Sequence, residues 1–259
     1  MEVSSKVAIV TGAGGGGSGR AIAKRLAREG ASVVVNDIDE AGGFETVRQI
    51  EADCGKASFF RADVSSEPQI KALMAFAEST FGGLDILVNS AGAHFSQGPL
   101  ENWVETIQGN LMASAFGILH AIEPMRKRGG GAIVNFSSTS ALGHGRKHSP
   151  WPAYDIAKAS IIRLTTTMAW LQEKERIRVN CIVPAWIASE EVKQFWEGLT
   201  PPQREEYGAP EVLLTLDEVA DAVLELITNE KLAGRVMVLW NGEPRRLIAE
   251  GDPGYAKFE

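Results

Sequence analysis

Tyr154 and Lys158 are the two residues with the clearest chemistry in this chain of 259 residues. Pro152 fits the first turn of a helix, and a helical apolar pattern continues after Lys158. The two residues are then i and i+4, so their side chains share one helix face. A phenol has a pKa of about 10, and a nearby ammonium favours the phenolate. The spacing predicts a tyrosine general acid and base assisted by a lysine, although so short a pattern is also typical of a solvated helix face.

The composition is that of an ordinary globular protein. Hydrophobic residues make up 44% of the chain, charged residues make up 23%, and the net charge is −7. Because there is no basic run, we expect no nucleic-acid partner and no binding to an anionic membrane. No apolar run approaches a membrane span, and no signal peptide precedes the first strand pattern. With two cysteines and no disulfide framework, we expect a soluble cytoplasmic protein.

Short β-rich apolar runs alternate with helical patterns along the chain. Most runs are nearly continuous, which is typical of strands covered on both faces. The alternation predicts a single α/β domain with a doubly wound, Rossmann-type parallel sheet of about seven strands and helices on both faces. Prolines interrupt the pattern at 185–215, which we interpret as a substrate lid. The expected strands are 7–10, 32–35, 57–60, 86–88, 132–136, 178–182 and 235–239, and the expected helices are 19–29, 40–52, 67–81, 101–128, 153–174 and 216–228.

A glycine-rich stretch joins the first expected strand to the first expected helix. The pattern G-x-G-x-x-G occurs there in two registers, one starting at Gly12 and one at Gly14. Glycines let the backbone approach a pyrophosphate, and the helix N-terminus supplies N–H donors. Asp37 ends the second expected strand, where an acidic side chain meets the ribose hydroxyls of a dinucleotide. Together they predict a dinucleotide site, with a structural loop and a solvated aspartate as the alternatives.

In this order the motifs resemble those of the short-chain dehydrogenase/reductase family, and the resemblance covers nearly the whole chain. The stretch that begins at Thr11 resembles the motif Thr-Gly-x-x-x-Gly-x-Gly with one extra residue. Ala185 and the stretch 239–242 depart from the family pattern. The cofactor-binding residues that the resemblance implies are Gly12, Gly17, Gly19, Asp37, Asp63, Val64, Asn89, Ala91, Gly92, Tyr154, Lys158, Pro184, Ile187 and Ser189.

The resemblance implies an oxidoreductase that transfers a hydride between NAD(H) and a secondary alcohol or ketone. Tyr154 would be the general acid and base, and Lys158 would lower its pKa and hold the nicotinamide ribose. Ser138 would hydrogen-bond the substrate oxygen and stabilise developing charge, with Ser137 as the less favoured choice. Asn110 would position a water that links Lys158 to solvent. These roles make Asn110, Ser138, Tyr154 and Lys158 the expected catalytic residues.

NAD is expected in preference to NADP. The Asp37 carboxylate can accept a hydrogen bond from a ribose 2′-hydroxyl but would repel a 2′-phosphate. Residues 38–40 add no positive charge, and Arg20 lies inside the first expected helix. The alternative is that Asp37 turns to solvent and the extra loop residue reshapes the pocket.

The partners expected are a small alcohol or ketone and further copies of the chain. By resemblance the assembly would be a homotetramer in which the helices at 101–128 and 153–174 pair across one interface. No cluster of residues has the spacing of metal ligands, so no metal is expected. The candidates for substrate contact, which flank the expected site, are His94, His148, Trp151, Trp186 and Trp196.

Two other classes of function compete with this interpretation. A nicotinamide-binding sensor without turnover is disfavoured by the intact set of Ser138, Tyr154 and Lys158. An epimerase or lyase that keeps NAD bound is disfavoured because such relatives carry a longer C-terminal substrate domain than the segment 185–215. An enoyl reductase is disfavoured because those relatives space the tyrosine and lysine more widely.

Overall fold

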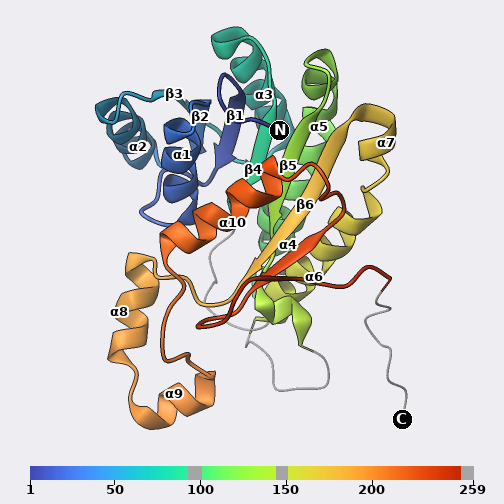
Figure 1. Cartoon of the computed structure of the whole chain (residues 1–259). Coiled ribbons are helices and arrows are strands. Elements are labelled where there is room, and N and C mark those ends of the chain that lie inside the picture. The colour runs from blue at the N-terminus through green and yellow to red at the C-terminus, as the bar shows by residue number, and fades with distance from the viewer. Residues whose placement is uncertain (93–100, 144–150, 252–259) are drawn as a thin grey trace.

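One sheet runs through the computed structural model, which describes residues 1–92, 101–143 and 151–251 (Figure 1). Its strand order is β3-β2-β1-β4-β5-β6-β7-β8. The pairs from β3 to β7 are parallel, and β8 is antiparallel to β7. The expected α/β fold is confirmed, with one short edge strand more than expected. The strands are β1 Val7–Thr11, β2 Ser32–Asp37, β3 Lys56–Arg61, β4 Ile86–Asn89, β5 Gly131–Phe136, β6 Ile177–Pro184, β7 Val236–Leu239 and β8 Arg246–Leu247.

Two of the expected helices are interrupted. The helix expected at 101–128 contains a π-helical turn, Gln108–Met112, between α4 and α5. The helix expected at 153–174 is broken at residues 168–170, between α6 and α7. The helices are α1 Ser18–Arg28, α2 Glu40–Ala52, α3 Glu67–Phe81, α4 Trp103–Ile107, α5 Ala113–Lys127, α6 Pro152–Thr167, α7 Leu171–Glu175, α8 Glu190–Gly198, α9 Pro201–Tyr207 and α10 Leu216–Thr228.

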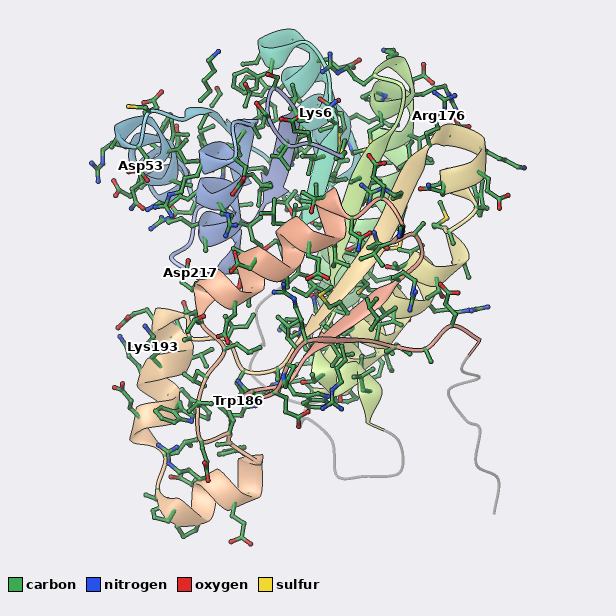
Figure 2. All side chains as sticks on the ribbon, in the orientation of Figure 1. Lys6, Asp53, Arg176, Trp186, Lys193 and Asp217 are labelled. Carbon is green, nitrogen blue, oxygen red and sulfur yellow. The ribbon has the colours of Figure 1, made fainter. Side chains whose placement is uncertain are left out.

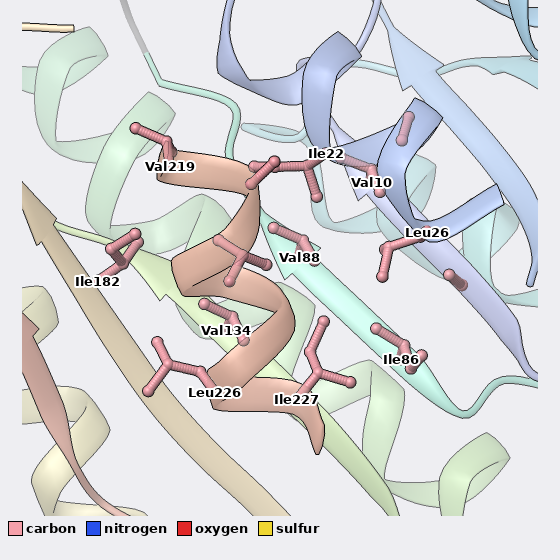
Figure 3. Close-up of a cluster of buried hydrophobic side chains, with 14 of the residues drawn as sticks. Val10, Ile22, Leu26, Ile86, Val88, Val134, Ile182, Val219, Leu226 and Ile227 are labelled. Carbon is pink, nitrogen blue, oxygen red and sulfur yellow. The ribbon is translucent and has the colours of Figure 1, made fainter. Parts of the chain in front are cut away.

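The sheet separates two apolar cores because alternate residues of each strand point to opposite faces. In β1, Ala8 and Val10 pack toward α1 and α10, whereas Ile9 packs toward α3 and α5. Figure 3 shows the first core, where α10 lies across the sheet beside α1. Both cores are fully buried, which explains the nearly continuous apolar runs of the sequence.

The chain changes direction in the sheet at β1. From β1 it runs outward through β2 and β3, and then returns to place β4 on the other side of β1. Ligands of doubly wound sheets bind outside the carboxyl ends of the strands at such a reversal. Thr11 links the two strand ends there, because its hydroxyl oxygen accepts hydrogen bonds from the N–H groups of Ser90 and Ala91, both at 3.1 Å. The glycine loop and the end of β4 are thereby held together at the expected cofactor edge.

Across the described ranges, no helix combines the length and the apolar character that crossing a bilayer requires. The segment after β6 instead carries the two short helices α8 and α9, which extend beyond the carboxyl edge of the sheet (Figure 1). This segment is the one interpreted from the sequence as a lid.

Candidate active site

The end of β5 and the start of α6 bring Ser138, Tyr154 and Lys158 together. Pro152 opens α6 as expected, and the Nζ atom of Lys158 lies 5.3 Å from the centre of the Tyr154 ring. Ser138 precedes a 3₁₀ turn, Thr139–Leu142, and its side chain hydrogen-bonds that of Tyr154. A hydroxyl and a phenol in contact, with an ammonium on the same helix face, form a group able to exchange a proton with a bound alcohol or ketone.

The two adjacent serines have different surroundings. Ser137 is buried, and its hydroxyl donates a hydrogen bond of 2.7 Å to the carbonyl of Lys158. It therefore fastens the end of β5 to α6. Ser138 is the one that reaches Tyr154, and its Oγ also accepts the N–H of Ser140 at 3.2 Å. This geometry favours Ser138, whose catalytic role stays a prediction.

Lys158 is a buried cation with a neutral hydrogen-bond partner. Its Nζ donates to the carbonyl of Phe136 at 3.1 Å, and the residue is only 5% exposed. Burial disfavours the charged form and lowers the pKa of Lys158 to about 8. At neutral pH the side chain is therefore mostly an ammonium, but one whose charge opposes folding.

The pKa of Tyr154 moves in the direction opposite to the one expected. The residue as a whole is half-buried, and burial raises the pKa of Tyr154 to about 12. The hydrogen bond from Ser138 lowers this pKa, and the charge of Asp155 raises it further. The lowering of this pKa expected from Lys158 is not found in the protein alone, because burial of the phenolate outweighs the other influences.

Replacing Lys158 by methionine is expected to raise the free energy of unfolding at pH 7 by about 2 kcal/mol, despite loss of the bond to Phe136. The pKa of Lys158 falls from 10.5 to about 8 on folding, so folding must bury a charge at neutral pH. Above about pH 8 the folded wild type releases its proton before the unfolded chain does, so its stability rises toward pH 10.5. Urea unfolding at pH 7 and pH 10 measures the difference between the two proteins, which should shrink at the higher pH.

The matched control for this prediction is Lys193→Met, because Lys193 is exposed on α8. It should change the free energy of unfolding by less than about 0.5 kcal/mol at either pH. The buried-charge argument would be contradicted if Lys158→Met were less stable than wild type at pH 7. It would also be contradicted if the difference in the free energy of unfolding were the same at pH 7 and pH 10.

Asn110 lies in the π-helical turn and has an unused acceptor. Its Nδ2 donates to the carbonyl of Thr106 at 2.9 Å, and the residue is 1% exposed. Within the described part of the chain, its buried Oδ1 has no hydrogen-bond partner. A Cβ added to Gly92 would lie within 4 Å of both this oxygen and the Nζ of Lys158. A water in that space would satisfy Oδ1, since buried polar groups are rarely left unpaired.

The three glycines predicted to bind the cofactor differ in what a side chain would meet. Gly12 has φ +66°, and a Cβ on it would lie 2.7 Å from the Cα of Ala91. A Cβ on Gly19 would lie 2.1 Å from the carbonyl oxygen of Gly12. A Cβ on Gly17 would meet only Ser189, at an ordinary 3.9 Å. Packing within the protein therefore accounts for Gly12 and Gly19, whereas the open space at Gly17 fits a bound ligand that approaches the backbone.

Gly14, one of the glycines between Thr11 and Gly19, contacts Asp37. The N–H of Gly14 donates to Oδ2 of Asp37 at 2.8 Å, and the N–H of Asp39 donates to Oδ1 at 3.0 Å. Arg20 holds the other side of the loop, since its guanidinium donates to the carbonyl of Gly14 and to Thr46 Oγ1 at 2.8 Å. The carboxylate is therefore fixed at the end of β2 beside the open loop, in the position that fits an adenosine ribose. Sequence reasoning missed the anchoring roles of Arg20 and Thr46.

The other residues assigned to the cofactor have mixed environments. The carboxylate of exposed Asp63 accepts hydrogen bonds from the N–H and hydroxyl of Ser65, at 2.9 and 2.7 Å. Val64 is half-buried against the core beneath α3. Asn89 donates to Oδ1 of Asn135 at 2.8 Å, so its side chain serves the interior of the sheet. Ala91 reaches the site through its backbone, which Thr11 holds.

The residues after β6 start the segment that carries α8 and α9. Pro184 ends β6, Ile187 forms a bridge with Leu214, and Ser189 caps α8 by accepting the N–H of Val192 at 3.4 Å. Their position beside a nicotinamide ring stays a prediction.

Asn241 fixes Trp186 from the C-terminal side. Its Oδ1 accepts the N–H of Trp186 at 3.2 Å, and its Nδ2 donates to the carbonyl of Trp186 at 2.8 Å. At the stretch 239–242, which departs from the family pattern, the Asn241 side chain therefore pairs with both backbone polar groups of Trp186, as a neighbouring strand's backbone would. The family pattern has glycine at position 241, which has no side chain to make either hydrogen bond.

The candidates for substrate contact divide into two groups. Trp186 stacks on Phe195 with ring centres 6.0 Å apart, and Phe195 contacts Tyr207 at 5.7 Å. Trp196 is used within the segment itself, since Arg204 lies 4.4 Å from its ring and its Nε1 donates to the carbonyl of Pro210 at 2.8 Å. Trp151 precedes α6 directly, and its carbonyl accepts the N–H of Tyr154 at 3.0 Å. His94 and His148 lie outside the described residues.

Among the residues that the structure describes, no group of histidine, cysteine, aspartate or glutamate side chains is arranged to hold a metal ion.

Comparisons with known proteins show what this chain is similar to. The model of the family described as enoyl-(acyl carrier protein) reductase matches residues 12–238. An uncharacterized oxidoreductase of Thermotoga maritima is 32% identical over 259 residues, which cover 96% of this chain and 99% of that protein. A cyclohexanol dehydrogenase of an Acinetobacter strain is 33% identical over 238 residues, which cover 88% of this chain and 90% of that protein.

A solved structure adds a view of a ligand-bound relative. It is a 7α-hydroxysteroid dehydrogenase complexed with NADH and 7-oxo glycochenodeoxycholic acid, 30% identical to this chain with a TM-score of 0.83. The match covers 95% of this chain and 97% of that one.

Proposed function

The chain belongs to the short-chain dehydrogenase/reductase family, and from that premise we propose that it interconverts a secondary alcohol and a ketone with NAD(H) as the hydride carrier. Dehydrogenases of this family act on CH–OH groups and use nicotinamide cofactors. The observation that carries the proposal is the contact of Tyr154 with Ser138 beside the buried ammonium of Lys158. All three lie at the carboxyl edge of the sheet, the edge that also carries the glycine loop and Asp37.

In ketone reduction Tyr154 donates its proton and Ser138 hydrogen-bonds the substrate oxygen. A pKa of about 12 keeps the phenol protonated at neutral pH, which suits this role as an acid. The cofactor, when bound, supplies or accepts the hydride at carbon. In alcohol oxidation Tyr154 must accept the hydroxyl proton, and the Lys158 ammonium then stabilises the developing phenolate.

Lys158 and Asn110 provide the route by which that proton reaches solvent. Lys158 has a pKa of about 8, so it can give up and regain a proton near neutral pH. A water held by the unpaired Oδ1 of Asn110 would accept it and pass it outward. In this proposal Lys158 also holds the nicotinamide ribose.

The substrate we propose is a largely apolar secondary alcohol or ketone. Trp186, Phe195 and Tyr207 present aromatic rings from the segment 185–215, which would close over the site as a lid. Cyclohexanol and steroid dehydrogenases among the similar proteins are named for substrates of this kind. Aromatic rings contribute large apolar contact area to such a pocket.

Turnover of a panel of cyclic secondary alcohols, followed as NADH release, tests the function. Sustained release is the expected result. Absence of turnover with retained NAD binding would instead favour a non-catalytic sensor, and turnover without net NADH release would favour an epimerase or lyase. A crotonyl thioester tests the enoyl reductase reaction named by the family model, which the four-residue spacing of Tyr154 and Lys158 disfavours.

The cofactor is proposed to be NAD, and Asp37→Ser is expected to remove most of the preference over NADP. The wild type should favour NAD by at least about tenfold in kcat/KM, because a 2′-phosphate would meet the fixed Asp37 carboxylate. The measurement is kcat/KM with both cofactors. Asp39→Ser is the matched control, because the Asp39 side chain is exposed and a serine keeps the backbone N–H that donates to Asp37, so this variant should keep the preference. A wild-type preference for NADP would refute the assignment.

Self-association is part of the proposal. Helices α4, α5 and α6 expose Trp103, Val104, Leu119 and Ile156 at 38, 65, 56 and 47%. A homotetramer that pairs these helices would bury them, as the family resemblance implies. The cysteines, exposed Cys54 and buried Cys181, are both free, which fits the reducing cytoplasm.

A further inference from the structure

We propose that a cavity at the amino-terminal edge of the sheet binds a small phosphate-bearing anion. The cavity has a volume of about 340 Å³ and lies where β1, β4, β5 and β6 begin. Catalytic residues occupy the opposite, carboxyl-terminal edge. Figure 2 shows Lys6 and Arg176 at one end of the sheet and Trp186 at the other. The charged side chains of its lining are Lys6, Asp85, Arg128, Arg176, Arg178 and Glu230.

The lining carries a surplus of positive charge in a protein whose net charge is −7. Asp85 is buried and shared between two cations, with its oxygens 3.6 Å from Lys6 and 3.1 Å from Arg128. It also accepts the N–H of Val7 at 2.9 Å, so with these three donors it has little capacity left for another. The side chain of Glu230 is 75% exposed and pairs with the amino terminus at 3.1 Å. The two carboxylates therefore leave the cavity cationic.

Several donors in the cavity remain available. Arg128 grips Asp85 through Nε and Nη2, and a guanidinium has five N–H groups, so Nη1 is left over. The guanidinium of exposed Arg176 has no hydrogen-bond or ion-pair partner within residues 1–92, 101–143 and 151–251. Arg178 is different, because it donates to carbonyls at the end of α10 and contributes only charge.

Gln172 contributes a hydrogen-bond acceptor whose position favours a ligand with a donor group. It lines the cavity from α7, and its buried Oε1 has no hydrogen-bond partner in the described part of the chain. A phosphate supplies acceptor oxygens for Lys6, Arg128 and Arg176, and its charge near −2 at neutral pH matches the surplus. A hydroxyl, either on inorganic phosphate or on an attached glycerol or sugar, would donate to Gln172.

Calorimetric titration of the full chain tests the site with two probes, inorganic phosphate and glycerol 3-phosphate. Each is titrated with and without saturating NADH, which occupies the glycine loop on the opposite edge. Binding that persists with NADH is the expected result. Arg176→Gln should weaken it at least about fivefold, through loss of a charge-assisted hydrogen bond. Lys174→Gln, which removes an equal charge from α7 outside the lining, should change it less than about twofold.

Tighter binding of glycerol 3-phosphate would identify a phosphate ester as the ligand, and equal binding would identify the phosphate group alone. The site is overturned if neither probe gives saturable heat with NADH present, or if Arg176→Gln and Lys174→Gln have the same effect. A thermal melt of each variant separates loss of the site from loss of the fold.

Discussion

Tyr154→Phe is expected to lower kcat by about 10²- to 10⁴-fold, the usual size of a general acid–base contribution. The substitution keeps the ring and removes only the hydroxyl that contacts Ser138. Because that hydroxyl is the proton donor and acceptor in the proposed reaction, the loss should appear in kcat in both directions. Cofactor affinity, measured by NADH fluorescence, should change little, since the cofactor contacts assigned to the glycine loop and Asp37 are untouched.

Tyr207→Phe provides the matched control. Tyr207 lies on α9, 45% exposed, and contacts Phe195 through its ring. Removing its hydroxyl should leave kcat within about threefold of wild type, because the ring that contacts Phe195 is kept and the hydroxyl has no part in the proposed proton transfer. Near wild-type turnover by Tyr154→Phe would show that another group moves the proton.

The second large effect is expected at Gly19. In Gly19→Ala the new Cβ would lie 2.1 Å from the carbonyl oxygen of Gly12 and 2.7 Å from its carbon. Alanine is favoured over glycine in a helix by about 1 kcal/mol, but overpacking against backbone costs about 1–3 kcal/mol and displaces the loop. We expect a lower melting temperature, measured by calorimetry, together with loss of NAD binding.

Gly17→Ala separates the fold from the ligand. Gly17 has φ −99°, which an alanine can adopt, and the new Cβ would meet only Ser189. Stability should therefore be unchanged or slightly higher, because alanine has fewer unfolded conformations. NAD affinity should still fall, by about tenfold or more, if the open loop faces the pyrophosphate. If Gly17→Ala and Gly19→Ala lowered the melting temperature equally, the argument that only Gly19 is required by packing would be contradicted.

The fold could be predicted from periodicity because the sheet is covered on both faces. Strands such as β1 are buried at every residue, so they appear in the sequence as short continuous apolar runs between helical patterns. The order of elements, the parallel sheet and the single domain were confirmed. The sequence does not predict the two-residue strand β8, because its residues are exposed and too few to show a periodic pattern.

Several features of the site could not be predicted from the sequence because they depend on local hydrogen bonds and burial. The π-helical turn around Asn110 has no signature in composition, and the left-over acceptor on Asn110 exists only in three dimensions. The anchoring of the glycine loop joins Arg20 to Thr46, 26 positions away, through a contact that no motif encodes. The direction of the Tyr154 pKa was wrong because the sequence shows the neighbouring lysine but not the burial.

The π-helical turn at Gln108–Met112 also bears on how this protein can change by mutation. A π turn contains one residue more than an α turn, so it corresponds to a single-codon insertion in an otherwise regular helix. Deleting one of its residues would restore the regular hydrogen-bond ladder, but would rotate α4 against α5 by about 100°. Point substitutions in the turn keep this geometry. A deletion that restored the regular hydrogen-bond ladder would move Asn110 away from Gly92 and Lys158. Mutation can therefore remove the π-helical turn only by also removing the placement of Asn110 beside Gly92 and Lys158.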